Sequence, residues 1–341
     1  MKRKLLISLV IIVSGLITAA LLIRSVAYRP NAGPEAPYRI LIKDETSVND
    51  LTDTLFSLGA LKNRKSFVSA VRLKNFSGTV KPGSYRIEKE VSNNQIINMF
   101  KAGRQSPVNV TFNNIRTLNE LAGKIGGQIE ADSAAIMSFF ADNANYSGDG
   151  FTYQTVISLF IPDTYQFYWT TNAGELYERM LKEYKKFWND ERLASAAAAG
   201  MKPLEVSVLA SIIDEETTMN DEKPRMAGVY LNRLRLGIPL QSDPTVKFAL
   251  NNFTIRRVLK QHLMIDSPYN TYIHRGLPPG PVRCPTKNTI DAVLNAEKHD
   301  FVYFVAKSDF SGYHQYSRTL SEHNRYANEY QRELNRRKIY R

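Results

Sequence analysis

The feature that most limits what this chain can fold into is an uncharged, apolar stretch of 19 residues near its start, residues 5–23. About 20 apolar residues in a helix span the hydrocarbon layer of a bilayer, so the stretch predicts one membrane-crossing helix. The basic residues 2–4 favour a cytoplasmic position for residues 1–4 and an exported body, an asymmetry that Arg24 and Arg29 weaken. A cleaved signal peptide is the alternative, but the run is long for one and no small-x-small cleavage site follows it.

The rest of the chain is expected to contain a linker and two folded units. Residues 24–37 are polar and carry prolines, as extended linkers do. Residues 38–106 show strand, helix, helix and strand patterns in order, and this βααβ arrangement resembles the LysM-like module, which often binds N-acetylated sugar polymers. Ser92 and Gly103 are expected to begin and end a further helix.

Residues 107–341 are expected to form a larger, helix-rich unit with a small sheet, so we assign the whole chain to the α+β class. The expected helices of this unit cover 117–125, 131–142, 174–198, 204–218, 225–235, 244–250, 286–298 and 321–337, and the expected strands cover 301–306 and 313–318.

Charge and cysteine content limit the classes of partner and site. The chain has 45 Lys and Arg residues against 33 acids, a net charge of +12, which favours an anionic partner such as nucleic acid, a membrane surface or an acidic cell-wall polymer. Nucleic-acid signatures such as zinc-finger spacing are missing. The five histidines lack metal-ligand spacing, and the single cysteine, Cys284, allows no internal disulfide. We therefore expect no metal, no cofactor and no nucleic-acid partner.

Three consecutive acids, Asp214, Glu215 and Glu216, follow an apolar helical pattern. On a helix with 100° per residue, Glu216 extends the apolar stripe that contains Leu209. Burial and a position near a helix C-terminus both raise the pKa of a carboxyl group. A carboxyl group that stays protonated near neutral pH is what general-acid catalysis requires, as in glycoside cleavage.

Structural interpretations of these acids remain open from the sequence. Glu216 could instead be a structural acid that forms an ion pair with Arg225 or Arg233. Asp214 and Glu215 fall on other sides of the helix and are expected to lie on a solvated face.

The segments that follow supply groups that could hold a sugar. A long Pro- and Gly-rich segment, residues 267–286, carries tyrosines and amides, as loops that line binding sites commonly do. Sugars need flat faces for stacking and planar amides for their hydroxyl and N-acetyl groups. Asp243 is also a candidate helix cap, and Asn232 a candidate for core hydrogen bonding. The candidate substrate-binding residues are Asn232, Gln241, Asp243, Tyr269, Asn270, Thr271 and Tyr272.

Four segments in this order, "ASIIDEET", "NRLRLGIPLQSDPTV", "SPYNTY" and "GLPPGP", resemble the endolytic murein transglycosylases of the MltG or YceG-like family. The upstream "IPDTYQF" is similar to a family segment too. The resemblance implies a catalytic Glu at the last acid of an "E-K-E-T"-type motif, which is Glu216 here. This chain departs from that motif at two positions: Asp214 replaces the first Glu, and Glu215 replaces the Lys.

The comparison with the family pattern extends to two later positions and to the proline loop. Glu222 matches a later acid, while Lys223 stands where an Arg is usual. The sequence "VRCPT" differs from common forms of the proline loop, so we assign no function to Arg283 or Cys284.

The resemblance implies a membrane-anchored lytic transglycosylase that cuts the β-1,4 bond between MurNAc and GlcNAc inside peptidoglycan strands. It would leave 1,6-anhydro-MurNAc ends and limit the length of nascent strands during cell-wall synthesis. Glu216 alone would protonate the bridging oxygen and then deprotonate the C6 hydroxyl that attacks C1. The implied location is the bacterial cytoplasmic membrane, as a single-pass protein with its catalytic domain on the periplasmic side. The implied partners are glycan strands, that membrane and peptidoglycan synthases.

Two other classes of protein remain as alternatives. One is a non-catalytic, membrane-anchored protein that binds glycan or serves as a scaffold of the cell-wall synthesis machinery. The other is a basic membrane protein that binds nucleic acid or anionic lipid, for which affinity would fall steeply with salt.

Overall fold

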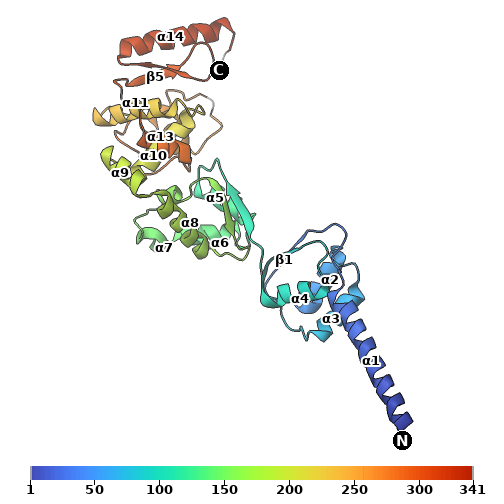
Figure 1. Cartoon of the computed structure of the whole chain (residues 1–341). Helices are drawn as coiled ribbons and strands as arrows, with labels where there is room; N and C mark the ends of the chain where they lie inside the picture. Colours follow the sequence, from blue (N-terminus) through green and yellow to red (C-terminus); the bar gives the residue numbers. More distant parts are fainter. Residues whose placement is uncertain (1, 256, 340–341) are drawn as a thin grey trace. The chain divides into compact units, whose positions relative to one another are not determined.

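The computed structural model describes residues 2–255 and 257–339 (Figure 1). The chain divides into two compact units. The N-terminal unit comprises Met1–Val110, Gln128–Glu130 and Tyr165–Thr171, and the C-terminal unit comprises Thr111–Gly127, Ala131–Thr164 and Asn172–Arg341. Helices dominate and the sheets are small, which confirms the mixed, helix-rich fold expected from the sequence.

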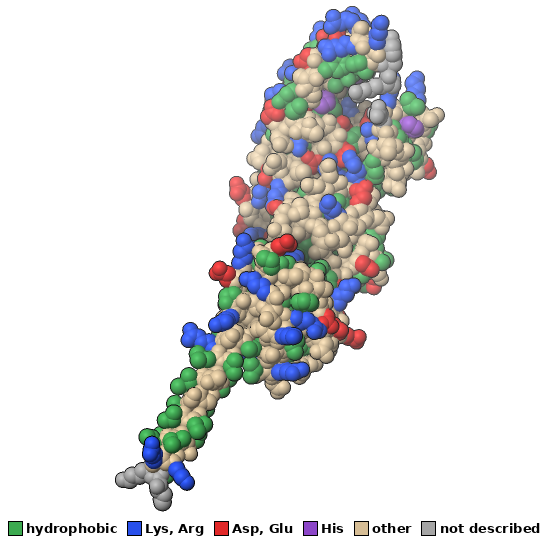
Figure 2. Space-filling model, turned by 90° about the vertical axis from the view of Figure 1, so that its right-hand side faces the viewer, with side chains coloured by type: hydrophobic (Ala, Val, Ile, Leu, Met, Phe, Trp, Pro, Cys, Tyr) green, Lys and Arg blue, Asp and Glu red, His purple; other side chains and the backbone are tan. Residues whose placement is uncertain are grey.

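Helix α1 (Lys2–Tyr28) begins the N-terminal unit. Its segment Arg3–Tyr28, 26 residues, is long and apolar enough to cross a membrane, and its most apolar stretch is not buried against the rest of the chain. Figure 2 shows hydrophobic side chains exposed along this helix and basic side chains near its free end. The last turn differs, because Val26 packs against the core of the N-terminal unit and its carbonyl accepts a hydrogen bond of 2.8 Å from Asn93 Nδ2.

The N-terminal unit has the expected order of strand, helix, helix and strand. These elements are β1 (Tyr38–Ile42), α2 (Val48–Ser57), α3 (Arg64–Leu73) and β2 (Gly83–Ile87). The two strands pair antiparallel, with Tyr38 opposite Ile87. Ser47 caps α2 through a capping box with Asp50, which satisfies two backbone N–H groups at the helix start.

Helix α4 (Asn93–Ala102) closes this unit, and its ends are where the sequence predicts them. Ser92 is the N-cap and forms a capping box with Gln95. Gly103 ends the helix in the left-handed region, with φ of 69°, where glycine carries no Cβ penalty. The ring of fully buried Phe100 packs against that of Tyr85, with centroids 4.5 Å apart and planes tilted by 45°, so an aromatic pair fixes α4 onto the sheet.

The first part of the C-terminal unit carries short helices. Strands β3 (Val108–Phe112) and β4 (Asp163–Phe167) pair in a two-stranded sheet whose residues are divided between the two units, and the sequence did not predict β4. The helices are α5 (Leu118–Gly126), α6 (Ser133–Ala141), α7 (Ala144–Ser147), η1 (Val156–Leu159), α8 (Ala173–Phe187) and α9 (Asp190–Ala198). The single helix predicted for 174–198 is wrong: the chain turns at Trp188, and Asn189 caps α9 by accepting from Arg192 N.

The second part of the C-terminal unit surrounds one central helix. Its elements are α10 (Pro203–Glu216), α11 (Lys223–Arg235), α12 (Asp243–Ala249), η2 (His262–Met264), α13 (Lys287–Leu294), β5 (Tyr303–Ala306), β6 (His314–Ser317) and α14 (Leu320–Arg336). Strands β5 and β6 form the expected hairpin. Helices α11 and α13 pack on α10 (Figure 1), as does α12. Every residue of α10 from Val206 to Asp214 is buried. A helix buried on all sides belongs to a core rather than to a surface, so α10 has no solvated face there.

Candidate active site

Glu216 is the last residue of α10, and three elements converge on its carboxyl group. Its Oε1 accepts a hydrogen bond of 2.8 Å from the hydroxyl of Tyr230, on α11, and one of 2.6 Å from Oγ of Ser242, the N-cap of α12. Tyr230 and Ser242 are each only 1% exposed, whereas Glu216 itself is partly exposed. The carboxyl group is therefore held in place by buried donors and still reaches the surface.

The surroundings of Glu216 favour its protonated form. Burial raises the pKa of its carboxyl group, the hydrogen bonds from Ser242 and Tyr230 lower it, and the charge of Asp243 raises it again. The net shift is upward. Burial dominates because an ionised carboxylate loses more hydration than two hydroxyl donors replace.

The hydrogen bonds also decide which oxygen carries the proton. Oε1 accepts from both Tyr230 and Ser242, so its two lone-pair positions are occupied. Burial holds the pKa of Tyr230 well above its usual range, so this phenol remains a donor at neutral pH. The proton of neutral Glu216 is therefore expected on Oε2, the oxygen that accepts neither of these hydrogen bonds.

A second carboxyl group, that of Asp243, lies near enough to Glu216 to raise its pKa. The hydroxyl of Tyr272 donates a hydrogen bond of 2.7 Å to Asp243 Oδ1. Asp243 was a candidate helix cap, but Ser242 occupies the N-cap of α12 and Asp243 is the first helical residue. The carboxylate is thus free of a capping role and is oriented by Tyr272 instead.

Gln241 and Thr271 join this cluster in different ways. Gln241 is exposed, in the left-handed region with φ of 53°, and its Oε1 accepts from Arg233 at 3.2 Å. Thr271 is buried: its Oγ1 accepts from Ser242 N at 3.0 Å and is 2.8 Å from the hydroxyl of Thr245. Thr271 therefore supports the turn that carries Ser242, while the Gln241 side chain is open to solvent.

The remaining three candidates have contacts inside the C-terminal unit. Asn232 Nδ2 donates to the carbonyls of His299 and Phe301, at 2.7 and 3.1 Å. Asn270 is buried, and its Nδ2 donates at 2.9 Å to two carbonyls of the preceding loop. Tyr269 packs at 4.7 Å on the ring of Phe248. The donor groups of both amides are thus engaged by backbone oxygens.

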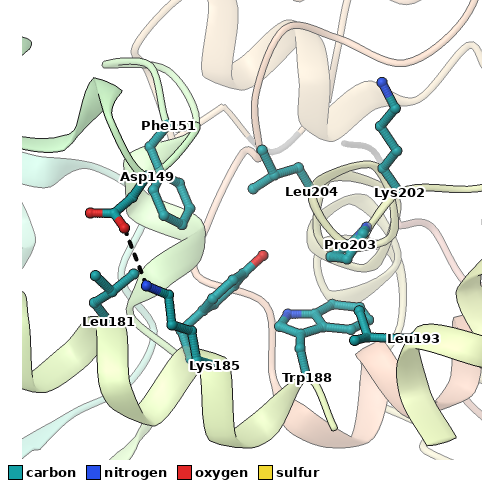
Figure 3. A pocket seen from close by; sticks show the side chains of 10 residues that line it. Asp149, Phe151, Leu181, Lys185, Trp188, Leu193, Lys202, Pro203 and Leu204 are labelled. Atoms are coloured by element: carbon teal, nitrogen blue, oxygen red, sulfur yellow. Dashed lines mark hydrogen bonds and ion pairs between the residues drawn. The ribbon is translucent and has the colours of Figure 1, made fainter. Parts of the chain in front are cut away.

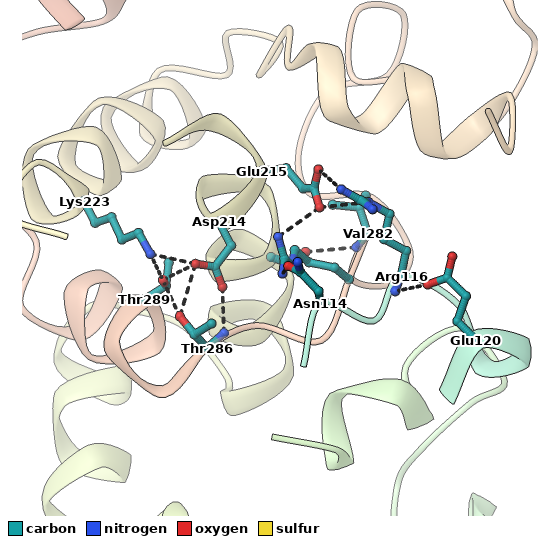
Figure 4. Close-up of polar contacts among 11 residues, drawn as sticks. Asn114, Arg116, Glu120, Asp214, Glu215, Lys223, Val282, Thr286 and Thr289 are labelled. Atoms are coloured by element: carbon teal, nitrogen blue, oxygen red, sulfur yellow. Dashed lines mark hydrogen bonds and ion pairs between the residues drawn. The ribbon is translucent and has the colours of Figure 1, made fainter. Parts of the chain in front are cut away.

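Asp214 does not lie on a solvated face, and that prediction is wrong. Its Oδ1 accepts a hydrogen bond of 2.8 Å from Lys223 Nζ, and the two side chains are only 3% and 6% exposed (Figure 4). Its other oxygen accepts from the backbone N–H of Thr286 at 2.6 Å, and the hydroxyls of Thr286 and Thr289 also contact the carboxylate. Because α10 is packed on all sides, a charge at this position has to be paired within the core.

Glu215 is also paired, so the same prediction is wrong for it. Arg116 and Arg283 each contact the carboxylate at 3.0 Å (Figure 4). Arg283, to which the sequence assigned no function, thereby ties the loop before α13 to the end of α10. In the same loop Cys284 is buried and donates its N–H to Ile115 O at 2.7 Å.

The two arginines considered as partners of Glu216 are engaged elsewhere. Arg225 pairs with Glu297 at 2.9 Å. Arg233 donates to the carbonyls of Pro239, Leu240 and Val302. In the part of the chain that the structure describes, neither arginine forms an ion pair with Glu216.

Sequence reasoning missed Tyr230 and Ser242, the two residues that contact Glu216. Ser242 precedes Asp-Pro, which is the signature of an N-cap, but that pattern does not say what else the hydroxyl touches. Tyr230 lies on the buried face of α11 beside Met226 and Ala227, and a buried tyrosine needs a partner for its hydroxyl. That need could have drawn attention to Tyr230.

Glu222 and His314 form a further pair near the site. His314 donates its backbone N–H to Glu222 Oε1 at 2.7 Å, and its Nδ1 is 2.9 Å from Oε2. Burial raises the pKa of Glu222, but the bonds from His314 more than offset it, so the pKa is lowered. The charge of His314 in turn lowers the pKa of Glu216.

No group of three or more His, Cys, Asp or Glu side chains that could hold a metal ion occurs among the described residues. The chemistry that the cluster offers is therefore that of a carboxyl group with hydroxyl donors and a neighbouring carboxylate.

The chain is similar to known proteins in sequence and in structure. It matches the model of the YceG-like family over residues 40–329. It is 27% identical over 319 residues to the endolytic murein transglycosylase of Bacillus subtilis (strain 168), covering 85% of this chain and 84% of that protein. It is 26% identical over 296 residues to that of Streptococcus pneumoniae (strain D39), covering 78% of this chain and 53% of that longer protein. A solved YceG-like protein from Listeria monocytogenes has a TM-score of 0.56 and 26% identity, covering 85% of this chain and 99% of that one.

Proposed function

The chain belongs to the YceG-like family, and on that premise we propose that it is an endolytic lytic transglycosylase that cuts peptidoglycan strands with Glu216 as its only acid and base. The names of its relatives support the substrate and the reaction. The observation that carries the proposal is the setting of Glu216: one carboxyl group with a raised pKa, two donors on Oε1, and Oε2 left to a ligand.

In the first step Glu216 acts as an acid. The proton on Oε2 passes to the oxygen that bridges MurNAc and GlcNAc, the bond from MurNAc C1 to that oxygen breaks, and GlcNAc leaves with a hydroxyl group. Positive charge develops at C1 as in other glycoside cleavages. Asp243, oriented by Tyr272, would stabilise that charge, and the exposed amide of Gln241 would bind sugar hydroxyls.

In the second step the same group acts as a base. Ionised Glu216 takes the proton of the MurNAc C6 hydroxyl while that oxygen attacks C1 and closes the 1,6-anhydro ring. Glu216 is then protonated again and water is not consumed. A second catalytic carboxylate, which most glycosidases need, is not required because the substrate supplies the nucleophile.

Replacement of Glu216 by Gln tests this assignment. Release of 1,6-anhydro ends from purified peptidoglycan, measured by mass spectrometry as the loss of one water at chain ends, is expected to fall about 10²- to 10⁴-fold. Glu205→Gln, at the other end of α10, is the matched control and is expected to keep activity. Equal release by Glu216→Gln and wild type would end the catalytic assignment. Loss of activity with intact binding to peptidoglycan would exclude the alternative of a scaffold that only binds glycan.

The N-terminal unit is proposed to hold this activity at the cytoplasmic membrane. Helix α1 would cross the membrane with the basic residues 2–4 on the cytoplasmic side, so that both folded units lie on the outer side. The attachment of the last turn of α1 to Asn93 argues for a retained anchor rather than a cleaved signal peptide. Protease added to intact spheroplasts is expected to degrade the folded units; protection of them would reverse the proposed orientation.

The βααβ unit is proposed to be a LysM-like glycan-binding module, and peptidoglycan synthases are proposed as partners. The support for the first is the order and antiparallel pairing of β1, α2, α3 and β2. A glycan-binding module and bound synthases would place the cleavage site next to newly made strands, so that the protein limits the length of nascent strands at the membrane. Pull-down of the E216Q protein with and without residues 38–106 on purified peptidoglycan would measure the contribution of the module to binding.

A further inference from the structure

A hollow of about 430 Å³ lies in the C-terminal unit between α8, the turn to α9 and the start of α10 (Figure 3). We name it the Trp188 pocket. Its volume is in the range of pockets that bind small ligands. It is lined by Asp149, Phe151, Leu181, Tyr184, Lys185, Trp188, Leu193, Lys202, Pro203 and Leu204.

Three aromatic rings form one side of the Trp188 pocket. The rings of Phe151 and Tyr184 meet edge to face at 5.5 Å, and those of Tyr184 and Trp188 lie 6.3 Å apart. Rings held against one another in this way present a rigid surface, since each has only two side-chain torsions and both are fixed by packing. A sugar ring has a flat face of C–H groups that stacks on such a surface.

The pocket also contains a buried donor that the protein does not use. Nε1 of Trp188 has no hydrogen-bond partner among the described residues, although the side chain is only 5% exposed. The indole nitrogen can only donate, and buried donors in native proteins almost always have an acceptor. Figure 3 shows this nitrogen on the edge of the ring that faces Lys185, toward the middle of the pocket. The missing acceptor is therefore one that a ligand can bring.

A fixed carboxylate and an ammonium group stand at the edge of the pocket. Asp149 accepts a hydrogen bond of 3.2 Å from Lys185 Nζ (Figure 3). It also accepts one of 2.8 Å from the hydroxyl of Tyr177. The bond from Tyr177, with that from Lys185, holds the pKa of Asp149 below its usual range. The edge thus offers acceptors and donors to hydroxyl groups.

We propose that the Trp188 pocket binds an N-acetylated amino sugar of the glycan strand, away from the bond that is cut. The acetamido carbonyl oxygen accepts from Trp188 Nε1, and its methyl group lies among the leucines. The sugar ring stacks on the aromatic side, and its hydroxyls reach Asp149 and Lys185. A purely aliphatic ligand would leave the indole N–H and the ion pair unused. The inference rests on the proposed function and names a second contact of the same substrate.

The two contacts lie at opposite ends of one rigid helix. Leu204 lines the pocket near the start of α10, and Glu216 ends that helix. At a rise of 1.5 Å per residue the separation along the axis is about 18 Å, which several linked sugars can span. A strand bound at both points is held more tightly than a fragment that reaches only one. The pocket would therefore favour long strands over short fragments.

Binding is tested through the fluorescence of Trp188 itself. The chain has two tryptophans, so Trp169→Phe leaves Trp188 as the single indole. In this variant with Glu216→Gln added to prevent cleavage, titration with a soluble β-1,4-linked GlcNAc tetramer is expected to change the emission saturably. Trp188→Phe with Trp169 kept removes the donor and is expected to weaken binding measured by calorimetry. Tetramer binding without any change in Trp188 emission, or no binding at all, would overturn the proposal.

The contribution to turnover is tested by filling the mouth of the pocket. Leu193 is 42% exposed, so Leu193→Trp is expected to fold, and Leu320→Trp at a 55% exposed leucine on α14 is the matched control. Leu193→Trp is expected to raise KM for long strands about tenfold, with kcat and the cleavage of short fragments unchanged. Identical KM values for the two variants would overturn the proposal. Neither outcome for KM changes the assignment of Glu216 as the catalytic residue, because that assignment is tested by the Glu216→Gln comparison alone.

Discussion

The end of α10 sets two kinds of carboxyl environment side by side. Asp214 and Glu215 are paired with cations, with Lys223 at 2.8 Å and with two arginines at 3.0 Å. Glu216, one residue further on, accepts hydrogen bonds from two hydroxyl donors through Oε1, and it forms no ion pair with any of the described residues. A cation stabilises the ionised form by its full charge, whereas hydroxyl groups leave burial to dominate. The difference separates two acids held in ion pairs from one that is held by hydroxyl groups and has a raised pKa.

The largest effect on stability is expected from removing the cation of the buried pair. Lys223→Met leaves the Asp214 carboxylate buried without its partner and is expected to lower the free energy of unfolding by about 3–5 kcal/mol. Urea denaturation of the wild type and the variant measures this. A loss under about 1 kcal/mol would mean that the threonine hydroxyls alone support Asp214, and the contrast with Glu216 would weaken.

Removing a donor from Glu216 should act on catalysis rather than on the core. Ser242→Ala deletes a bond that lowers the pKa of Glu216, so the pKa is expected to rise further. Activity needs protonated Glu216, so the fall of kcat at alkaline pH should move to higher pH. Ser207→Ala, whose hydroxyl bonds Pro203 O on the same helix, is the control and should leave the pH profile in place. An unmoved alkaline limb in Ser242→Ala would contradict the hydrogen-bond assignment.

Stability should depend on pH through Glu216 with a defined sign. Its folded-state pKa lies above the ordinary value of 4.5, so the folded chain binds this proton more tightly than the unfolded chain. The wild type then has its full stability from this group below pH 4.5 and loses it as pH rises through the folded pKa. Glu216→Gln cannot ionise and is expected to be more stable than the wild type at neutral pH and equal to it in acid. Denaturation at several pH values measures the difference.

Glu222 should show the opposite sign. Its pKa is lowered by His314, so it contributes stability above the ordinary value of 4.5 that is lost as pH falls through the folded pKa. Glu222→Gln is expected to be less stable than the wild type at neutral pH, with a gap that closes in acid. The same sign for both variants would show that the two carboxyl groups are not distinguished by their partners.

The smallest effect is expected at the surface. Arg225 and Glu297 form an ion pair at 2.9 Å, but their side chains are 48% and 41% exposed. Arg225→Met is expected to change the free energy of unfolding by about 0–1 kcal/mol, because solvent and salt screen exposed pairs. A larger loss of stability in Lys223→Met than in Arg225→Met would show that burial makes the Asp214–Lys223 pair important for stability. Similar losses in the two variants would contradict that conclusion.

Local rules predicted much of the helical framework. Ser92 and Gly103 bound α4 because a capping hydroxyl and a residue that tolerates positive φ act within a few residues of the helix end. The apolar stripe of α10 did not separate Glu216 from its neighbours, because every residue from Val206 to Asp214 is buried while Glu216 is partly exposed. The break in the helix at Trp188 could not be predicted from local rules, because capping of α9 by Asn189 competes with continuation of α8 through the same residues.

By itself, the sequence determined where most of the helices lie, that Glu216 is near the end of a helix with an apolar pattern, and which family motifs surround it, because these depend on periodicity, caps and residue order along the chain. Only the tertiary structure decided that α10 is enclosed on all sides from Val206 to Asp214, so that Asp214 became a paired core residue, and that Glu215 became a partly buried acid paired with two arginines. It also decided that Tyr230 and Ser242, 14 and 26 residues away from Glu216, orient its carboxyl group. Hydrogen bonds between residues so far apart depend on how helices pack, and a pattern read along one helix carries no information about which side chain a neighbouring helix brings to it.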